Sequence, residues 1–195
     1  MLSVITFASV IVPLAFALTS TELAKQCPDE DTGCHMGALA NFCAGSNQKT
    51  LDKMWRDCPC SCMARADERL TECCLSVGPK TRPECLPLCT HRSTAEELGQ
   101  PESRACFDLL HVLTYCGGEG ADARKCCADS GVTEKCQRLC LSGYSPSKCG
   151  EQQEDYEHCL DGEDLPKIRR CFLYNLHRKP AWAKSWRGDR CVFDG

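Results

Sequence analysis

The sequence predicts a mostly α, small disulfide-rich fold, in which a six-cysteine head precedes a twofold-repeated helical domain of twelve cysteines. Three observations support this prediction. Twenty of the 195 residues are cysteines, a share of about one tenth that is typical of disulfide scaffolds in secreted proteins. Twelve of these cysteines repeat one spacing twice. The segments between them place apolar residues at helical intervals, and no segment alternates as a strand would.

The first 20 residues have the character of a secretory signal peptide. They are uncharged and mostly apolar, and the first charged side chain is Glu22. Ala15-Phe16-Ala17 fits the small-x-small rule for cleavage. The alternative is a membrane anchor, but Pro13 lies within a run that is already marginal for a spanning helix. We therefore expect residues 1–20 to be a signal peptide and the protein to be secreted and extracellular, with no transmembrane segment after signal removal.

The composition further limits the classes of function that are possible. Aromatic residues make up only 7% of the chain, so small domains built from it have thin cores, to which each disulfide adds about 2–4 kcal/mol of stability. The formal net charge of −4 is mild and argues against a nucleic-acid partner. We expect ten disulfides, no free thiol and no cofactor.

The cysteines fall into groups along the chain. Six lie in the head: Cys27, Cys34, Cys43, Cys58, Cys60 and Cys62. A first set then follows the spacing CC-x10-C-x3-C-x16-C-x9-C: Cys73, Cys74, Cys85, Cys89, Cys106 and Cys116. A second set follows CC-x8-C-x3-C-x18-C-x11-C: Cys126, Cys127, Cys136, Cys140, Cys159 and Cys171. Two cysteines are left over, and we expect the bond Cys149–Cys191 between them.

The pairing inside each set stays open. Six cysteines allow fifteen connectivities, and neighbours such as Cys126 and Cys127 are too close for an ordinary bond to each other.

Helices are predicted throughout the repeated region. In Pro101–Cys116, apolar residues recur along one helical face, and Gly117-Gly118 ends the pattern. Segments 63–70, 133–140 and 151–160 are also compatible with helices. A last helix is expected over Leu165–Leu176, with Pro166 in its first turn.

The head, residues 27–62, resembles the ShK-toxin-like (ShKT) six-cysteine module. The resemblance rests on Cys27-x-Asp29, the gaps to Cys34 and Cys43, and Lys53-Met54 before Cys58. The end departs from the family, because Cys58-Pro59-Cys60-Ser61-Cys62 replaces C-x3-C-x2-C. The resemblance implies three bonds: Cys27–Cys62, Cys34–Cys58 and Cys43–Cys60.

Residues 68–174 resemble the nematode DB module, a twelve-cysteine extracellular domain without an established function. The resemblance rests on Cys73-Cys74, the CLPLC of 85–89, Gly120-Ala121-Asp122 before Cys126-Cys127, and the closing Cys171-Phe172. It implies six disulfides among the two sets. Residues 175–195 then form a C-terminal tail.

Enzymatic and metal chemistry find little support. Cys58, Cys60 and Cys62 have spacing compatible with a soft metal, but disulfides prevail in the oxidising secretory route. The histidines form no local motif with a cysteine. We expect no catalytic residue, no metal site and no enzymatic activity.

Two surfaces are candidates for binding. In the toxin that names the ShKT family, a lysine followed by an aromatic residue blocks a potassium channel; here Lys53 has that place, and a structural ion pair with Asp29 is the alternative. In the basic tail, the candidates are Trp182, Trp186 and the integrin-type tripeptide Arg187, Gly188 and Asp189.

Together these features predict a secreted cysteine-rich protein that acts by protein–protein interaction with an unknown extracellular protein or cell-surface receptor. The alternatives are a potassium-channel modulator acting through the head and a non-catalytic accessory domain of a secreted enzyme.

Overall fold

The computed structural model describes residues 29, 33–45, 47–77, 82–177 and 191, and every named element within them is helical. One isolated antiparallel bridge joins Asp122 to Leu141. Nine disulfides lie among the described residues. The predicted mostly α, small disulfide-rich fold is confirmed.

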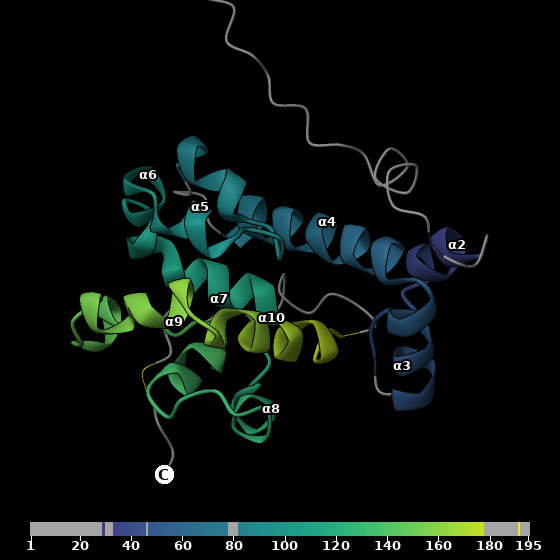
Figure 1. The fold of residues 1–195 in the computed structure, drawn as a ribbon. Helices are drawn as coiled ribbons and strands as arrows, with labels where there is room; N and C mark the ends of the chain where they lie inside the picture. The colour runs from purple at the N-terminus through teal and green to yellow at the C-terminus, as the bar shows by residue number, and fades with distance from the viewer. Residues whose placement is uncertain (1–28, 30–32, 46, 78–81, 178–190, 192–195) are drawn as a thin grey trace, which may run out of the picture.

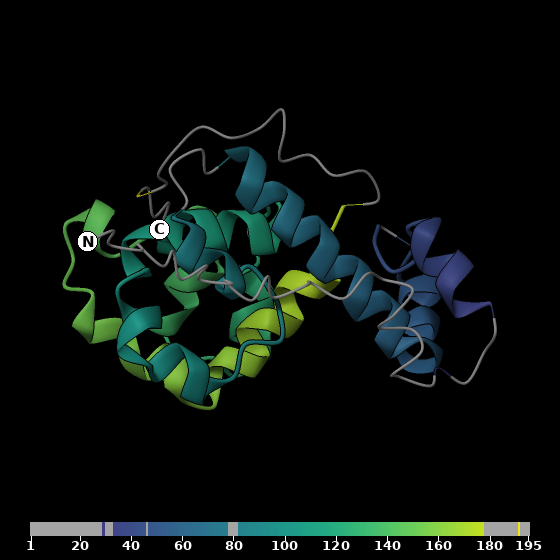
Figure 2. The ribbon, with the colours of Figure 1, turned by 90° about the horizontal axis from the view of Figure 1, so that it is seen from above.

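One long helix, α4 (Pro59–Val77), joins the head to the rest of the protein. Figures 1 and 2 place α2 (Cys34–Leu39) and α3 (Gln48–Asp57) at one end of α4, and the later helices along the rest of it. The segment 63–70, compatible with a helix by sequence, lies inside α4. A continuous helix therefore stands where a linker between head and repeats could have been.

The start of α4 is capped by a side chain from far back in the sequence. The carboxylate of Asp29 accepts hydrogen bonds from the backbone N–H of Cys60 at 3.0 Å and of Ser61 at 3.1 Å, and from the Ser61 hydroxyl. These N–H groups have no partner within the helix, and a negative charge is stabilised at this end of a helix dipole. Asp29, which precedes α2 in the sequence, is therefore held at the start of α4.

Two of the head disulfides implied by the ShKT resemblance are wrong. Cys34 pairs with Cys58, but Cys43 pairs with Cys62 rather than Cys60, so Cys62 is not bonded to Cys27. Helix geometry explains the difference: Cys58 and Cys62 are four residues apart and share one face, whereas Cys60 points to another side. That shared face is buried against Cys34 and Cys43, and Cys60 forms a disulfide of its own.

The region of the first set runs from α4 through η1 (Pro83–Leu88), α5 (Ala95–Gly99), α6 (Pro101–Arg104), η2 (Phe107–Leu109) and α7 (Leu110–Gly118). The single helix predicted over Pro101–Cys116 is therefore wrong. Cys106, with φ −95° and ψ 1°, leaves the helical conformation. Two ties from outside hold the chain there, because Cys106 is bonded to Cys85 and Arg82 donates a hydrogen bond to the carbonyl of Ala105.

The region of the second set comprises α8 (Arg124–Asp129), η3 (Cys136–Cys140), η4 (Ser147–Cys149), η5 (Glu154–Tyr156), α9 (Glu157–Asp161) and α10 (Asp164–Tyr174). The helical signals at 133–140 and 151–160 correspond to short 3-10 turns and the brief α9. The last helix has Pro166 in its first turn, as predicted.

Both sets pair their cysteines in the same order: first with sixth, second with fourth, and third with fifth. The first set forms Cys73–Cys116, Cys74–Cys89 and Cys85–Cys106. The second forms Cys126–Cys171, Cys127–Cys140 and Cys136–Cys159. The repeated spacing thus coincides with a repeated connectivity. Cys149 pairs with Cys191, the expected partner.

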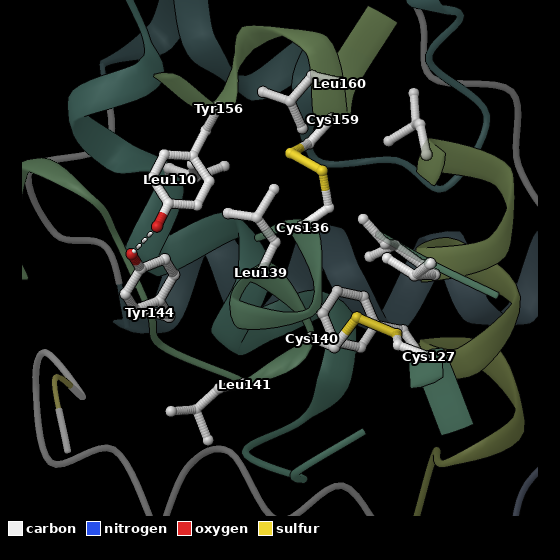
Figure 3. Packing of buried hydrophobic residues seen from close by; sticks show 14 of the residues in the cluster. Leu110, Cys127, Cys136, Leu139, Cys140, Leu141, Tyr144, Tyr156, Cys159 and Leu160 are labelled. Carbon is white, nitrogen blue, oxygen red and sulfur yellow. Dashed lines mark hydrogen bonds between the residues drawn. A yellow bond between two sulfur atoms is a disulfide. The ribbon is translucent and has the colours of Figure 1, made fainter. Parts of the chain in front are cut away.

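The two sets share a core. Leu98, Phe107 and Leu110 from the first region pack in one cluster with residues of the second, such as Leu139 and Phe172. Figure 3 shows this cluster around the Cys127–Cys140 and Cys136–Cys159 bonds, with a hydrogen bond of 2.8 Å between the Tyr144 and Tyr156 hydroxyls. Helix α7 packs against both α4 and α10.

A buried ion pair ties α4 to the ends of α7 and α10. The Arg69 guanidinium donates to both carboxylate oxygens of Glu119, at 2.7 and 2.6 Å. Arg69 also donates to the carbonyl of His177, whose N–H donates to Glu119 at 3.1 Å. Glu119 itself ends α7 in the left-handed region, at φ 50°. Both charges are almost fully buried, so each depends on the other.

Candidate functional site

The cysteines supply no thiolate for metal or nucleophilic chemistry in the described residues, where no cysteine is free. One cluster has metal-ligand character, Cys136, His158 and Cys159. Its two sulfurs belong to the same disulfide, whereas a cysteine that ligates zinc must be a thiolate. The cluster is therefore a histidine that lies beside a structural disulfide.

Lys53 is exposed on α3 and forms an ion pair with Asp57 at 3.4 Å, one helical turn away. The alternative partner considered from the sequence, Asp29, is wrong, because Asp29 caps α4 instead. The pKa of Asp57 is lowered by its hydrogen bonds, from Arg56 first and then from Lys53. An exposed pair of this kind contributes little to stability.

The aromatic residue near Lys53, Trp55, is partly buried. Trp55 donates a hydrogen bond from Nε1 to the carbonyl of Cys43 at 3.2 Å. Its ring stacks on Tyr174 of α10 with centroids 6.3 Å apart. Trp55 therefore packs the head against the last helix.

The head carries a concentration of exposed apolar side chains, which we call the head patch: Met36, Leu39 and Phe42. Their side chains are 67%, 44% and 41% exposed. The described residues contain one further large apolar side chain with such exposure, Leu75 on α4. Met36 and Leu39 are one turn apart on α2 and so share a side.

The base beneath the head patch is rigid. The patch lies between Cys34 and Cys43 in the sequence, and these cysteines are bonded to Cys58 and Cys62. The Phe42 ring lies against α2 at Gly37, where an added Cβ would be 3.7 Å from its Cδ2. An apolar surface that is already held in place loses little entropy on binding.

A cavity of about 90 Å³ lies between the two sets of cysteines, and we call it the central cavity. Sixteen residues line it, and eleven of these carry Leu, Ile or Phe side chains. Its polar lining residues are Thr90, His91, Thr114 and Arg169. Leu110, Leu139 and Leu160, which line the cavity, converge from three elements in Figure 3.

His91 is the buried titratable group of this cavity. It is 6% exposed, and its Nε2 has no hydrogen-bond partner. Burial lowers its pKa to about 4, against the attraction of Asp67, and the nearby Arg169 lowers it further. The imidazole is therefore neutral in the folded protein at neutral pH.

The sign of the pH effect follows from this lowered pKa. The unfolded state, with a histidine pKa near 6.5, binds a proton at a higher pH than the folded state does. Stability from the neutral His91 is therefore complete above about pH 6.5 and is lost as the pH falls towards 4.

The predicted tail residues Trp182, Trp186, Arg187, Gly188 and Asp189 lie outside the described residues, as do Cys27 and the predicted signal peptide. The sequence singled out neither the head patch nor His91. The patch has a weak signal in the apolar spacing of Met36 and Leu39 between two cysteines. No sequence signal brings His91 to Arg169, which lies far along the chain.

Short helices held by two equally ordered disulfide sets define a small, disulfide-stabilised α-helical protein. None of the helices in the described part of the chain is long and apolar enough to cross a membrane. The family model of the DB module matches residues 73–172, which contain both sets. The chain therefore belongs to the DB module family. Neither the curated proteins nor the solved structures yielded a match.

Proposed function

We propose that this protein is a secreted, non-catalytic binding protein, which contacts an extracellular protein or receptor through the head patch. The observation that carries the proposal is the exposure of Met36, Leu39 and Phe42 within seven residues of a disulfide-braced segment. Apolar side chains gathered at the surface mark contact sites more often than scattered ones do. Methionine and aromatic residues are also enriched at the centres of protein interfaces.

The disulfides support an extracellular site of action. Bonds of this number persist in oxidising surroundings and are rare in the cytosol. They also brace the head at one end of α4, where Figure 2 shows α2 and α3 projecting beyond the other helices. A partner that binds this end meets little obstruction from the repeated region.

Binding to cells tests the proposal. The labelled, disulfide-intact protein should bind saturably to the surface of cells from its own tissue. The double variant Met36→Ser/Leu39→Ser should bind at least about tenfold more weakly, because central apolar contacts each contribute about 1–2 kcal/mol.

Leu75→Ser is the matched control, since Leu75 is equally apolar and 60% exposed but lies on α4 outside the patch. It should bind as the wild type does. Equal loss in both variants, or an unchanged affinity of the double variant, would exclude the head patch as the contact surface.

A further inference from the structure

The polar groups around the central cavity differ in how well they are paired. The Thr114 hydroxyl donates to the Tyr144 carbonyl at 3.0 Å and accepts from the Gly143 N–H at 3.2 Å. The Thr90 hydroxyl donates to Asp67 at 3.0 Å and accepts from the Arg92 N–H at 3.1 Å. Both threonines are thus satisfied.

The lining residues with unused hydrogen-bonding groups are His91 and Arg169. Nε2 of His91 is buried without a partner, which is a costly arrangement unless a ligand or water completes it. Arg169 donates one hydrogen bond, to the Ser93 carbonyl. A guanidinium has five N–H donors, so it retains donors for a further acceptor.

The acidic groups near Arg169 are engaged elsewhere. Asp67 and Glu97 are the carboxylates that act on its charge. Asp67 accepts from the backbone of His91 at 2.7 Å and forms an ion pair with Arg92. Glu97 accepts from the backbone of Thr94 at 2.7 Å in a capping box. Arg169 forms no ion pair with another described residue and is half-buried, so it lacks a bound counter-charge.

A wider crevice lies beside the central cavity, close to the hydrogen-bond acceptor of Arg169. A crevice of about 400 Å³ adjoins the central cavity, and Leu88 and Thr90 line both. Ser93, the acceptor for Arg169, lines this crevice as well. Arg169, which lines the central cavity, is therefore hydrogen-bonded to a residue of the adjoining crevice.

We propose that the central cavity binds a small alkyl carboxylate, with its chain among the leucines and its carboxylate on Arg169 and His91. A guanidinium and a carboxylate form charge-assisted, often bidentate, hydrogen bonds. The imidazole completes the site from Nε2 in the tautomer that carries its proton there.

The volume limits the length of the chain. A cavity of about 150 Å³ lined by Leu, Ile and Phe holds benzene, so about 90 Å³ accommodates a chain of roughly four carbons beyond the carboxylate. Each CH₂ that enters should improve affinity by about fourfold. The improvement should stop once the cavity is filled.

A titration of the disulfide-intact, full-length secreted protein tests the site. Carboxylates from acetate to octanoate, each with the primary alcohol of equal length, are added while the His91 ring proton is followed by NMR. We expect saturable binding that strengthens up to about pentanoate, and at least tenfold tighter binding of that acid than of its alcohol.

Arg169→Gln should abolish the advantage of the acid over the alcohol. Arg170→Gln is the matched control, because Arg170 is the next residue on α10 and lies over the Tyr174 ring outside the cavity lining. It should retain the wild-type preference. Gly117→Ala provides a second variant, in which the added methyl group occupies the cavity between Phe172 and His91 and should weaken pentanoate most.

Three results would each overturn the proposal. The first is an absence of saturable binding for the whole series. The second is equal affinity of acid and alcohol in the wild type. The third is an equal loss in the Arg169→Gln and Arg170→Gln variants. If Arg169→Gln does not fold, an unchanged affinity for pentanoate in Gly117→Ala would overturn it instead.

Discussion

Two neighbouring glycines at the end of α7 should respond to alanine in opposite ways. Gly117 and Gly118 are both buried, and both lie within the helix. An added Cβ at Gly117 would meet the Phe172 ring at 3.4 Å and the His91 ring at 3.7 Å, which are ordinary contact distances. An added Cβ at Gly118 would overlap Ser142 Oγ and lie 2.9 and 3.0 Å from two atoms of the Phe172 ring.

The magnitudes follow from helix propensity and packing. Replacing a helical glycine by alanine stabilises a protein by about 0.5–1 kcal/mol when the methyl group fits. We expect this gain for Gly117→Ala. At Gly118 the ring of Phe172 must move within the shared core, and overpacking of this kind costs about 1–3 kcal/mol. After the propensity gain is subtracted, Gly118→Ala should lose up to about 2 kcal/mol.

Urea unfolding with disulfides intact, followed by circular dichroism, measures the difference. The two variants should be separated by the overpacking cost of about 1–3 kcal/mol, which corresponds to roughly 2–12 °C in Tm for a chain of this size. Mass measurement before unfolding verifies that both variants carry the wild-type number of disulfides. If Gly118→Ala is as stable as Gly117→Ala, the packing of α7 on α10 described above is incorrect.

Three further predictions concern single polar residues. Asp29→Ala should lower the free energy of unfolding by about 1–2 kcal/mol, because the start of α4 loses its cap. Lys53→Ala should leave the urea midpoint unchanged, and equal losses in the two variants would contradict the assignment of the cap. Arg69→Met should cost about 3–5 kcal/mol, because its carboxylate partner stays buried without a counter-charge. Lys125→Met at the exposed pair with Asp129 should stay near the wild type in the same assay. Between pH 6.5 and 4 the free energy of unfolding of the wild type should fall by about 3 kcal/mol through His91. His91→Gln should make this fall smaller, and an equally steep fall in the variant would refute the buried neutral imidazole.

The cysteine spacing predicts groups of bonds better than it predicts partners. The two sets and the leftover pair are visible in the spacing, because equal units repeat it. The partner of Cys43 is not, because it depends on where α4 begins. Once the helix starts at Pro59, Cys58 and Cys62 share a face and Cys60 leaves it. A shortening of three residues at the end of the head therefore alters the connectivity that the ShKT resemblance implies.

The break within the helix predicted over Pro101–Cys116 could likewise not be predicted from the sequence. The apolar spacing of Pro101–Cys116 suits a helix, but the bond from Cys106 to Cys85 and the hydrogen bond from Arg82 to Ala105 act across the sequence. The spacing of apolar residues predicts which face of a helix is buried, but it does not predict disulfides or hydrogen bonds to distant residues. The same limit applies to the central cavity, whose polar end joins His91 to a residue of α10.

The disulfides also explain why an apolar cavity is tolerated in so small a core. A cavity of about 90 Å³ costs on the order of 2 kcal/mol at about 24 cal/mol per Å³. One disulfide contributes about 2–4 kcal/mol, and five cysteines of the second set lie in the cluster around the cavity. Large side chains are then not required to fill the space between the repeats. A fold stabilised by crosslinks rather than by dense packing can retain an apolar pocket that ends on an arginine.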